Sequence, residues 1–221
     1  MAAAISRDPR ASATRSHVAA GRSAWRPPEP ITYAYLLGLF LGDGCLIRRS
    51  RASPQLVLTL DPRYPRIIDE AVAAIEKTVP GINVPRAARP GCVALLASHR
   101  VWAAAFPQGL GSGRKHHRRI ELTAWQRQVT HSHPPSLLRG LLHSDGCRSV
   151  NRFRTLLPSG RLREYSYVRY FFTNYSADIR QIFCEHCDLI GICWTQSSFK
   201  NISIAHRDSV ALLDRFVGPK R

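Results

Sequence analysis

One ten-residue pattern occurs twice in this chain and constrains its fold more than any other feature. Residues 36–45 read LLGLFLGDGC and residues 138–147 read LRGLLHSDGC, which align without a gap on the frame L-x-G-L-x-x-x-D-G-C. Around each copy, apolar periodicity and turn signals predict the same order of elements: helix, hairpin, helix, hairpin and helix. Such an internal duplication predicts two similar halves in one chain.

The predicted elements can be given by residue range for each half. In the first half we expect helices over 33–43, 63–79 and 99–106, and strands over 45–50, 55–60, 83–89 and 92–97. In the second half we expect helices over 137–145, 176–190 and 208–216, and strands over 147–157, 161–173, 192–198 and 201–206. The domain organisation is then a disordered basic arm over residues 1–30, a first half over 31–130 and a second half over 131–221.

The two motif helices carry start and stop signals and small residues. Thr32 is expected to cap the first helix, and the glycine after each motif aspartate is expected to end its helix in a left-handed conformation. Small residues four positions apart give each helix one smooth face, so that the two helices can pack closely in the core. These residues are Gly38 and Gly42 in the first copy, and Gly140 and Ser144 in the second.

Each motif places an aspartate at the C-terminus of its helix, where the helix dipole is already negative. If the two helices pair about a twofold axis, Asp43 and Asp145 converge at one end of the pair. Two carboxylates at two negative helix ends need a cation, and oxygen ligands with few protein donors favour Mg²⁺. The alternative is a pair of ordinary buried helices that end in Asp-Gly turns.

The charge of the chain narrows the class of its partner. The 221 residues include 32 Lys and Arg against 15 Asp and Glu, which is a formal net charge of +17. This excess favours a polyanion, with nucleic acid before an anionic membrane surface. The sequence has neither a basic amphipathic helix nor an apolar run long enough to span a membrane. With 44% hydrophobic and 21% charged residues, its composition excludes disorder of the whole chain.

The cysteines and the N-terminus bear on the compartment of the protein. Six cysteines and no apolar secretory segment favour a reduced, cytoplasmic chain; the alternative is an organelle, if the Ala-, Arg- and Ser-rich arm is a transit peptide. Cys184 and Cys187, with Cys193 and His206, suggest a zinc site as an alternative. Because no second C-x-x-C accompanies them, we expect small buried hydrophobic residues instead.

The two motifs resemble those of the LAGLIDADG homing endonucleases in their single-chain form, over about residues 31–221. The resemblance implies an α/β (α+β) fold of two αββαββα halves, whose four-stranded sheets form a saddle on double-stranded DNA. It also implies that Asp43 and Asp145 ligate Mg²⁺ or Mn²⁺, joined by the backbone carbonyls of Gly42 and Ser144. The earlier acidic position of the family motif is Leu41 in one copy and His143 in the other, and that position is not a metal ligand in the family.

The family also has a lysine late in each half, near each active site. This chain has four lysines, and Lys115 and Lys220 each follow a short predicted helix that ends in phenylalanine. The resemblance implies that these two lysines stabilise charge or help to activate water. The alternative is that they only contact phosphates.

A DNA-binding saddle requires strands with one polar face, and residues 161–169 alternate in this way. Arginine and tyrosine fall at every second position, while Val168, Tyr170 and Phe172 fall between them. The residues expected to contact DNA are Arg48, Arg49, Arg51, Gln55, Arg86 and Arg89 in the first half, and Arg148, Arg152, Arg154, Arg161, Arg163, Tyr165, Tyr167, Arg169, Gln196, Ser198 and Lys200 in the second.

These features predict a monomeric, site-specific DNA endonuclease with internal pseudo-twofold symmetry. It would cut both strands of a long target by Mg²⁺-assisted phosphodiester hydrolysis. The alternative is a catalytically silent DNA-binding regulator, or an intron-RNA maturase, on the same scaffold; RNA is a partner only in the maturase case. An intein is disfavoured because the chain lacks flanking splicing blocks.

Overall fold

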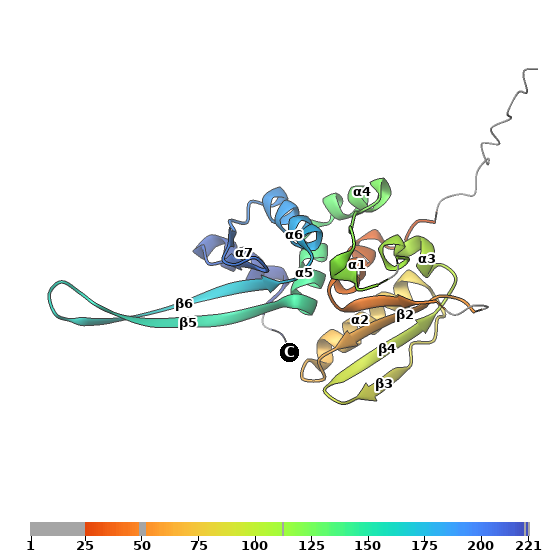
Figure 1. Ribbon diagram of the computed structural model, residues 1–221, viewed down its shortest axis with the longest axis horizontal. Coiled ribbons are helices and arrows are strands. Elements are labelled where there is room, and N and C mark those ends of the chain that lie inside the picture. The colour runs from red at the N-terminus through yellow and green to blue at the C-terminus, as the bar shows by residue number, and fades with distance from the viewer. Residues whose placement is uncertain (1–24, 49–51, 112, 219, 221) are drawn as a thin grey trace, which may run out of the picture.

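The two copies of the repeated pattern form two equivalent helices at the junction of two similar units (Figure 1). The computed structural model describes residues 25–48, 52–111, 113–218 and 220. The first unit contains α1 (Pro30–Asp43), β1 (Gly44–Ile47), β2 (Gln55–Leu60), α2 (Pro65–Thr78), β3 (Arg86–Arg89), β4 (Cys92–Ser98) and α3 (Trp102–Ala105). Two 3₁₀ turns follow, η1 (Pro107–Gly109) and η2 (Lys115–His117).

The second unit repeats this order. It contains α5 (Pro134–Asp145), β5 (Gly146–Leu156), β6 (Leu162–Thr173), α6 (Ala177–Leu189), β7 (Thr195–Gln196), β8 (Asn201–Ile204) and α7 (Arg207–Phe216). Within the described residues each unit has one antiparallel four-stranded sheet, with strand orders β1-β2-β4-β3 and β5-β6-β8-β7. The expected α/β fold of two αββαββα halves is confirmed.

One helix of the structure was not among the predicted elements. It is α4 (Ala124–Ser132), which lies between the units and contacts both α1 and α5. Thr123 and Gln126 form a capping box at its start, and Gln126 Nε2 donates to the Tyr33 hydroxyl at 2.8 Å. The T-x-x-Q spacing was the available sequence signal. The proposed boundary between residues 130 and 131 falls within this helix.

Helices α1 and α5 pack through the small residues that the motif supplies. A Cβ atom built on Gly38 would lie 2.5 Å from the Leu137 carbonyl oxygen and 2.7 Å from the Leu141 nitrogen. A Cβ on Gly140 would meet the Tyr35 carbonyl oxygen and would lie 3.0 Å from the Gly38 Cα. The close approach predicted for the two motif helices is therefore confirmed, and it is a contact of backbone with backbone.

The capping expectations for α1 were wrong at both ends. The helix begins at Pro30 after an N-cap Glu29, and Thr32 donates its hydroxyl hydrogen bond to the Glu29 carboxylate. At the C-terminus Gly44 has φ −96°, and Gly146 after α5 has φ −101°, so both are extended rather than left-handed. Glycine is required there for space, because a Cβ on Gly44 would lie 2.6 Å from the Phe40 Cα.

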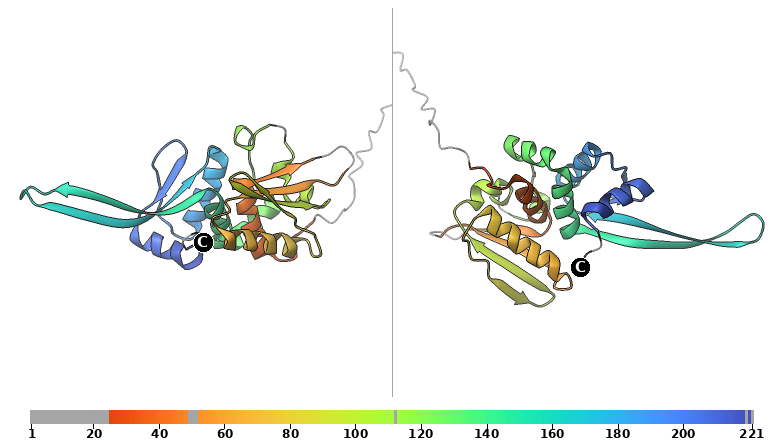
Figure 2. Two further views of the ribbon diagram at one scale, coloured as in Figure 1. Left: turned by 90° about the horizontal axis from the view of Figure 1, so that it is seen from below. Right: turned by 180° about the vertical axis from the view of Figure 1, so that it is seen from behind.

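The hairpins of the two units differ in length. In the first unit β1 has 4 residues and β2 has 6, and the part of the predicted 45–50 strand at residues 49–51 lies outside the described residues. In the second unit β5 has 11 residues and β6 has 12, and this hairpin extends well away from the body of the molecule (Figures 1 and 2). The last predicted hairpin is shorter than expected, because β7 spans only Thr195–Gln196.

The core continues from one unit into the other. One cluster of buried side chains joins Leu36 and Leu39 of α1 with Leu58 of the first sheet, Leu141 of α5 and Phe172 of the second sheet. The two motif helices are therefore held in place from both sides by side chains of both sheets.

None of the helices formed by the described residues is long and apolar enough to cross a membrane.

Candidate functional site

The ends of α1 and α5 bring Asp43 and Asp145 together. A Cβ on Gly42 would lie 3.0 Å from the Asp145 Oδ2 atom, which shows how close the second carboxylate is to the end of α1. Burial raises the pKa of Asp43 to about 7, and the negative charge of the nearby Asp145 contributes to the same shift. Burial also raises the pKa of Asp145, against the hydrogen bond that Asn174 donates to it. The helix pair thus holds two carboxyl groups that are costly to ionise together.

Lys115 reaches this position from η2 and binds the C-terminal end of α1. Its Nζ donates to the carbonyl oxygens of Phe40 at 2.5 Å, Gly44 at 2.8 Å and Gly42 at 3.2 Å, and it lies 5.1 Å from the centre of the Phe40 ring. Burial lowers the pKa of Lys115 to about 8, and the charges of the two aspartates oppose that shift. Its positive charge therefore offsets both the helix dipole and the carboxylates.

Lys220 occupies the corresponding place at α5. Its Nζ donates to the Ser144 carbonyl oxygen at 3.1 Å, and burial lowers its pKa while Asp43 and Asp145 oppose the shift. Lys220 also lines a pocket of about 240 Å³ together with Asp43, Ser144 and Asp61. The structure thus brings the four residues expected to be catalytic to one place.

The two lysines share a local feature that the sequence interpretation missed. Lys115 follows Gly113, which has φ 77°, and Lys220 follows Gly218, which has φ 64°. Both glycines lie in the left-handed region, which side chains other than glycine rarely adopt. The repeated signal is therefore G-x-K, even though the lengths that separate each lysine from the preceding phenylalanine differ.

Two further polar residues of this region were not predicted. Asn174, directly after β6, donates from Nδ2 to Asp145 Oδ2 at 2.6 Å. Asp61, directly after β2, occupies the equivalent position in the first unit and forms an ion pair with Arg63 at 2.6 Å. The sequence signal was a polar residue that ends the second strand of each unit, and only the duplicated topology makes it visible.

The donor atoms around the two aspartates are consistent with a hard divalent cation. No hydrogen bond to the Asp43 carboxylate is formed within the described part of the chain, whereas Asp145 accepts one from Asn174. Among the same residues no group of three or more His, Cys, Asp or Glu side chains could hold a metal. Two carboxylates and backbone carbonyls remain, and oxygen donors of this kind suit Mg²⁺ or Mn²⁺. The Gly42 and Ser144 carbonyls already accept hydrogen bonds from the lysines.

Cys184 and Cys187 are buried in α6 and Cys193 is exposed, and all three are free thiols. Within the described residues these cysteines belong to no group of three or more His, Cys, Asp or Glu side chains that could hold a zinc ion. The expectation that Cys184 and Cys187 are buried small hydrophobic residues is confirmed.

The residues expected to contact DNA in the long hairpin divide between its two faces. Side chains that stand opposite each other in the β5–β6 ladder share one face, as Phe153 does with Tyr165 and Asn151 with Tyr167. This face carries a ladder of rings and cations, since the Arg163 guanidinium lies 5.1 Å from the Tyr165 ring and that of Arg169 lies 5.1 Å from the Tyr167 ring. Arg161, just before β6, is exposed at the far end.

The arginines of β5 lie on the opposite face, which differs from the single surface expected. Arg148, Arg152 and Arg154 pair in register with Tyr170, Ser166 and Glu164. Arg154 forms an ion pair with Glu164 at 3.3 Å, and Arg152 is exposed. Arg148 is held by Asp214 of α7, because its Nε donates to Asp214 Oδ1 at 2.8 Å. The pleat separates odd from even positions, so residues of β5 and β6 share a face only where the register pairs them.

The first-unit residues divide in the same way. Gln55 and Arg89 lie on the face that turns away from the helices, since Gln55 pairs with Ser98 and Arg89 with Cys92. Arg86 pairs with the buried Leu95 and forms an ion pair with Asp69 of α2 at 2.9 Å, so it faces the helices. Arg48 is exposed just after β1, and Arg49 and Arg51 lie outside the described residues.

The last three expected contacts lie around β7 and β8. Gln196 pairs with the buried Ile202 and lines a pocket with Arg180 and Cys184 of α6, so it too faces the helices. Lys200 donates from Nζ to the Tyr175 hydroxyl at 3.0 Å, and the Ser198 hydroxyl accepts from the Lys200 backbone at 3.4 Å. Lys200 is therefore part of an aromatic cluster near the end of β6.

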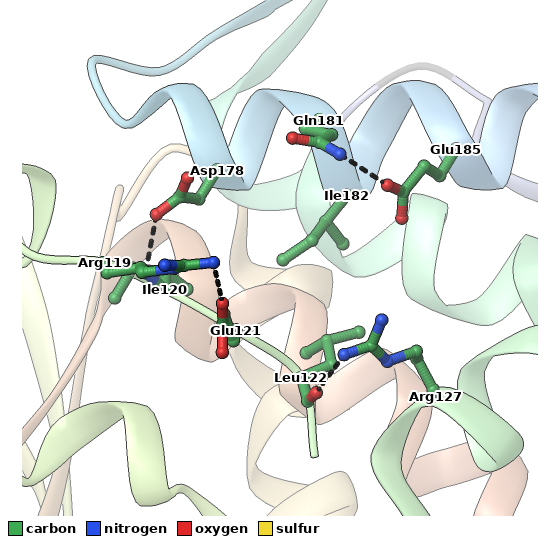
Figure 3. A pocket seen from close by; sticks show the side chains of 9 residues that line it. All are labelled: Arg119, Ile120, Glu121, Leu122, Arg127, Asp178, Gln181, Ile182 and Glu185. Carbon is green, nitrogen blue, oxygen red and sulfur yellow. Dashed lines mark hydrogen bonds and ion pairs between the residues drawn. The ribbon is translucent and has the colours of Figure 1, made fainter. Parts of the chain in front are cut away.

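A separate pocket of about 260 Å³ lies between α6, α4 and the segment that joins the units (Figure 3). Its charged side chains are satisfied within the chain: Asp178 Oδ2 accepts from the Ile120 backbone at 2.7 Å, and Arg119 pairs with Glu121 at 2.5 Å. Arg127 donates to the Leu122 carbonyl oxygen at 3.1 Å. The hydrogen bond between Ile120 and Asp178 fastens the connecting segment to α6 of the second unit, whereas the other two contacts lie within the segment or between it and α4.

No protein-family model and no curated protein matches the sequence. Among solved structures, the chain is similar to I-DmoI in complex with DNA and Mn, at 14% identity over 87% of this chain and 98% of that chain, with a TM-score of 0.54. It is also similar to the LAGLIDADG meganuclease I-AabMI bound to uncleaved DNA (11% identity, 83% and 82%, TM-score 0.52). The N-terminal LAGLIDADG domain of DUF199/WhiA matches equally well (12% identity, 87% and 84%, TM-score 0.52). The fold of this chain is therefore a LAGLIDADG-like fold.

Proposed function

We propose that this protein is a site-specific DNA endonuclease that cuts both strands of a long DNA target. The observation that carries the proposal is the meeting of Asp43, Asp145, Lys115 and Lys220 at the junction of α1 and α5. Two acids and two cations from two equivalent units match the requirement of a reaction performed twice, once on each strand. A scaffold retained only for packing would not need four half-buried charged groups in one place.

The two aspartates are the residues that would hold Mg²⁺ or Mn²⁺. Such an ion, when bound, neutralises charge that develops on a phosphodiester and lowers the pKa of water. The neighbour I-DmoI was solved with DNA and Mn and also with DNA and Ca. Lys115 and Lys220 contribute positive charge beside the same phosphates, and Asn174 orients the Asp145 carboxylate through its hydrogen bond.

Double-stranded DNA is the proposed partner, bound by the protein as a monomer. The net charge of +17 favours a polyanion, and the ladder of the exposed Arg163 and the half-buried Tyr165, Tyr167 and Arg169 offers groups that contact phosphates and base edges. Neighbours of the same fold, including I-AabMI and I-LtrWI, are bound to DNA. We expect this binding in the cytoplasm, at the nucleoid.

A cleavage assay with the purified full chain tests the function. A plasmid that carries the insertion-free genomic locus of the gene, incubated with Mg²⁺, is expected to give one discrete double-strand cut. Asp43→Asn and Asp145→Asn should each lower the cleavage rate by about 10³-fold or more while DNA affinity stays within about threefold. Asp208→Asn is the control, because Asp208 is an exposed carboxylate of α7. Double-strand cleavage retained by either motif variant would contradict the proposal.

A catalytically silent DNA-binding regulator, or an intron-RNA maturase, is the second candidate. It is favoured by one contact set: Lys115 already binds three carbonyl oxygens at the end of α1, so the helix end is neutralised without a metal. Solved structures similar to this chain include the LAGLIDADG domain of DUF199/WhiA as well as endonucleases. Binding of the locus without a cut, in both Mg²⁺ and Mn²⁺, would favour the regulator; preferential binding of the intron transcript would favour the maturase.

A further inference from the structure

The two lysines of the candidate site are held by different means. Lys115 Nζ makes three hydrogen bonds, with the carbonyl oxygens of Phe40, Gly42 and Gly44 at the C-terminal end of α1. Lys220 Nζ makes one hydrogen bond, to the Ser144 carbonyl oxygen at 3.1 Å, and lies 5.6 Å from the centre of the Tyr64 ring. Because a single hydrogen bond restrains a long flexible side chain only weakly, the place of Lys220 depends on how the segment that carries it is held.

That segment leaves α7 through a tight turn. The Val217 backbone N–H closes the helix with a hydrogen bond to the Leu213 carbonyl oxygen at 2.8 Å, and Gly218 follows with φ 64°. The direction of the chain towards Lys220 is therefore set by the last turn of α7 and by Gly218. Whatever anchors that last turn also determines where Lys220 lies.

The anchor is Asp214 in the last turn of α7. Arg148 of β5 binds its carboxylate through two parallel hydrogen bonds, Nε to Oδ1 at 2.8 Å and a terminal nitrogen to Oδ2 at 2.9 Å. Such two-point pairs fix orientation as well as distance. Arg148 lies three positions after Asp145 in the chain, so this pair ties α7 directly to the end of the motif helix α5.

Tyr170 completes the arrangement from β6. It is the register partner of Arg148, and its buried hydroxyl donates to Asp214 Oδ1 at 2.6 Å. The Tyr170 hydroxyl oxygen also lies 3.3 Å from the Gly218 carbonyl oxygen, which belongs to the turn itself. The side chain of Tyr170 thus contacts both the anchor and the turn.

We propose that Arg148, Asp214 and Tyr170 form a clamp that positions Lys220 against the end of α5. They are positioning residues, and Arg148 serves the clamp rather than DNA. The placement of Lys220 by the clamp does not depend on the proposed function; only its consequence for cleavage rests on that function.

The chemical reactivity of Lys220 tests the placement without any cleavage assay. Acetylation of the full-length protein by a water-soluble ester, followed by mass spectrometry of peptides, gives the rate at each lysine. Asp214→Asn is expected to raise the rate at Lys220 roughly three- to tenfold, since one partner of a charged two-point pair is lost. Lys115 should not change, and the exposed Lys77 is the internal reference.

Glu164→Gln is the matched control, because it removes the carboxylate of another arginine pair, with Arg154, in the same hairpin. It should leave the reactivity of Lys220 unchanged. Arg148→Gln removes the other member of the Arg148–Asp214 pair, and it provides the test if the Asp214→Asn variant does not fold. Equal reactivity of Lys220 in Asp214→Asn, Arg148→Gln and Glu164→Gln would overturn the clamp.

Cleavage kinetics then test the consequence. Asp214→Asn should lower kcat as much as Lys220→Ala does, with DNA affinity unchanged, and Asp214→Glu should restore most of the rate. The double variant of Asp214→Asn with Lys220→Ala should be no slower than Lys220→Ala alone. Additive losses would overturn the clamp. If the native protein cuts no DNA but Asp214→Asn still exposes Lys220, the proposed function fails and the clamp stands.

Discussion

At the scale of single residues, the candidate site depends on glycines that allow backbones to touch and on charges that are buried together. Gly38 and Gly140 let α1 and α5 approach until the backbone of one helix contacts that of the other. This approach carries Asp43 and Asp145 to one position, where burial raises the pKa of both.

Gly38→Ala should lower the free energy of unfolding by about 3 kcal/mol, because its methyl group would meet backbone atoms of α5 that cannot move aside. Gly91→Ala is the control: Gly91 has φ 75° and no atom within 4 Å of a built Cβ, so only backbone strain of about 1 kcal/mol is expected. Urea denaturation measures both. Equal losses would contradict the close packing of the two helices.

The pH dependence of stability follows from the raised pKa of Asp43. A carboxyl group with a folded pKa of about 7, above its ordinary value of 3.8, binds its proton more tightly when folded. Its contribution therefore favours folding below pH 4 and is lost as pH rises towards 7. Without divalent ions, Asp43→Asn should raise the free energy of unfolding at pH 8 by about 1–3 kcal/mol and change it little at pH 4.

The same measurement tests the metal. Mg²⁺ added at pH 8 should stabilise the native protein, because a ligand that binds only the folded state shifts unfolding. Asp43→Asn and Asp145→Asn should lose this stabilisation, and Asp208→Asn should keep it. Stabilisation by Mg²⁺ that is equal in all four proteins would contradict a metal at the two aspartates.

At the scale of elements, the β5–β6 hairpin is the main candidate for DNA contact, and its two faces are not equivalent. One face carries the ladder of Arg163, Tyr165 and Phe153, in which the two rings stack with centres 5.1 Å apart. The other carries Arg152 and the exposed Val150 and Leu156. The pleat of the strands, not the number of arginines, therefore decides which side chains can meet a duplex together.

Arg163→Ala should weaken DNA binding several-fold more than Arg152→Ala, although each removes one positive charge from the same hairpin. The slope of log affinity against log salt should fall by about 1 for Arg163→Ala and by less for Arg152→Ala. Titrations of a fluorescent duplex at several salt concentrations measure both quantities. Equal effects of the two variants would show that the ladder face is not the binding face.

At the scale of the whole molecule, the two units share one topology but differ in the length of their first hairpin. A strand of 12 residues such as β6 spans about 40 Å, and one of 6 residues such as β2 spans about 20 Å. At about 3.4 Å per base pair, this difference corresponds to roughly 6 base pairs. Both units meet at the junction of α1 and α5, where the proposed active site lies, so contacts with a duplex would extend unequally from it.

The protein should accordingly protect DNA asymmetrically about the cut. We expect protection to extend roughly 6 base pairs further on the side bound by the second unit. Nuclease footprinting of the target locus in Ca²⁺ gives the two lengths, and a variant with residues 152–166 replaced by a two-residue turn, which keeps Asn151 opposite Tyr167, should lose the longer one. Equal protection on both sides in the native protein would contradict this reach.

Most of the fold and the convergence of the two aspartates could be predicted from local patterns, whereas Lys115 and Lys220 were expected near them only from the resemblance to a known family. Helix periodicity, the glycines of the motif and the duplicated frame identified α1 and α5 and placed Asp43 and Asp145 at their ends. The helix α4 escaped because its only local signal is the capping box at Thr123 and Gln126. The expected left-handed Gly44 was wrong because close packing, not a turn, requires a glycine there.

The sequence by itself determined the two units, the paired helices and the aspartates at their ends, because these depend on spacings of three to eight residues along one backbone. Only the tertiary structure decided which arginines are available to a partner. Arg148 and Arg86 resemble the exposed arginines in sequence, yet Asp214 and Asp69 hold them against helices. Asp214 lies 66 positions away from Arg148, and no local pattern can pair residues across such a distance. Their pairing follows from strand register and helix packing, which the whole fold sets.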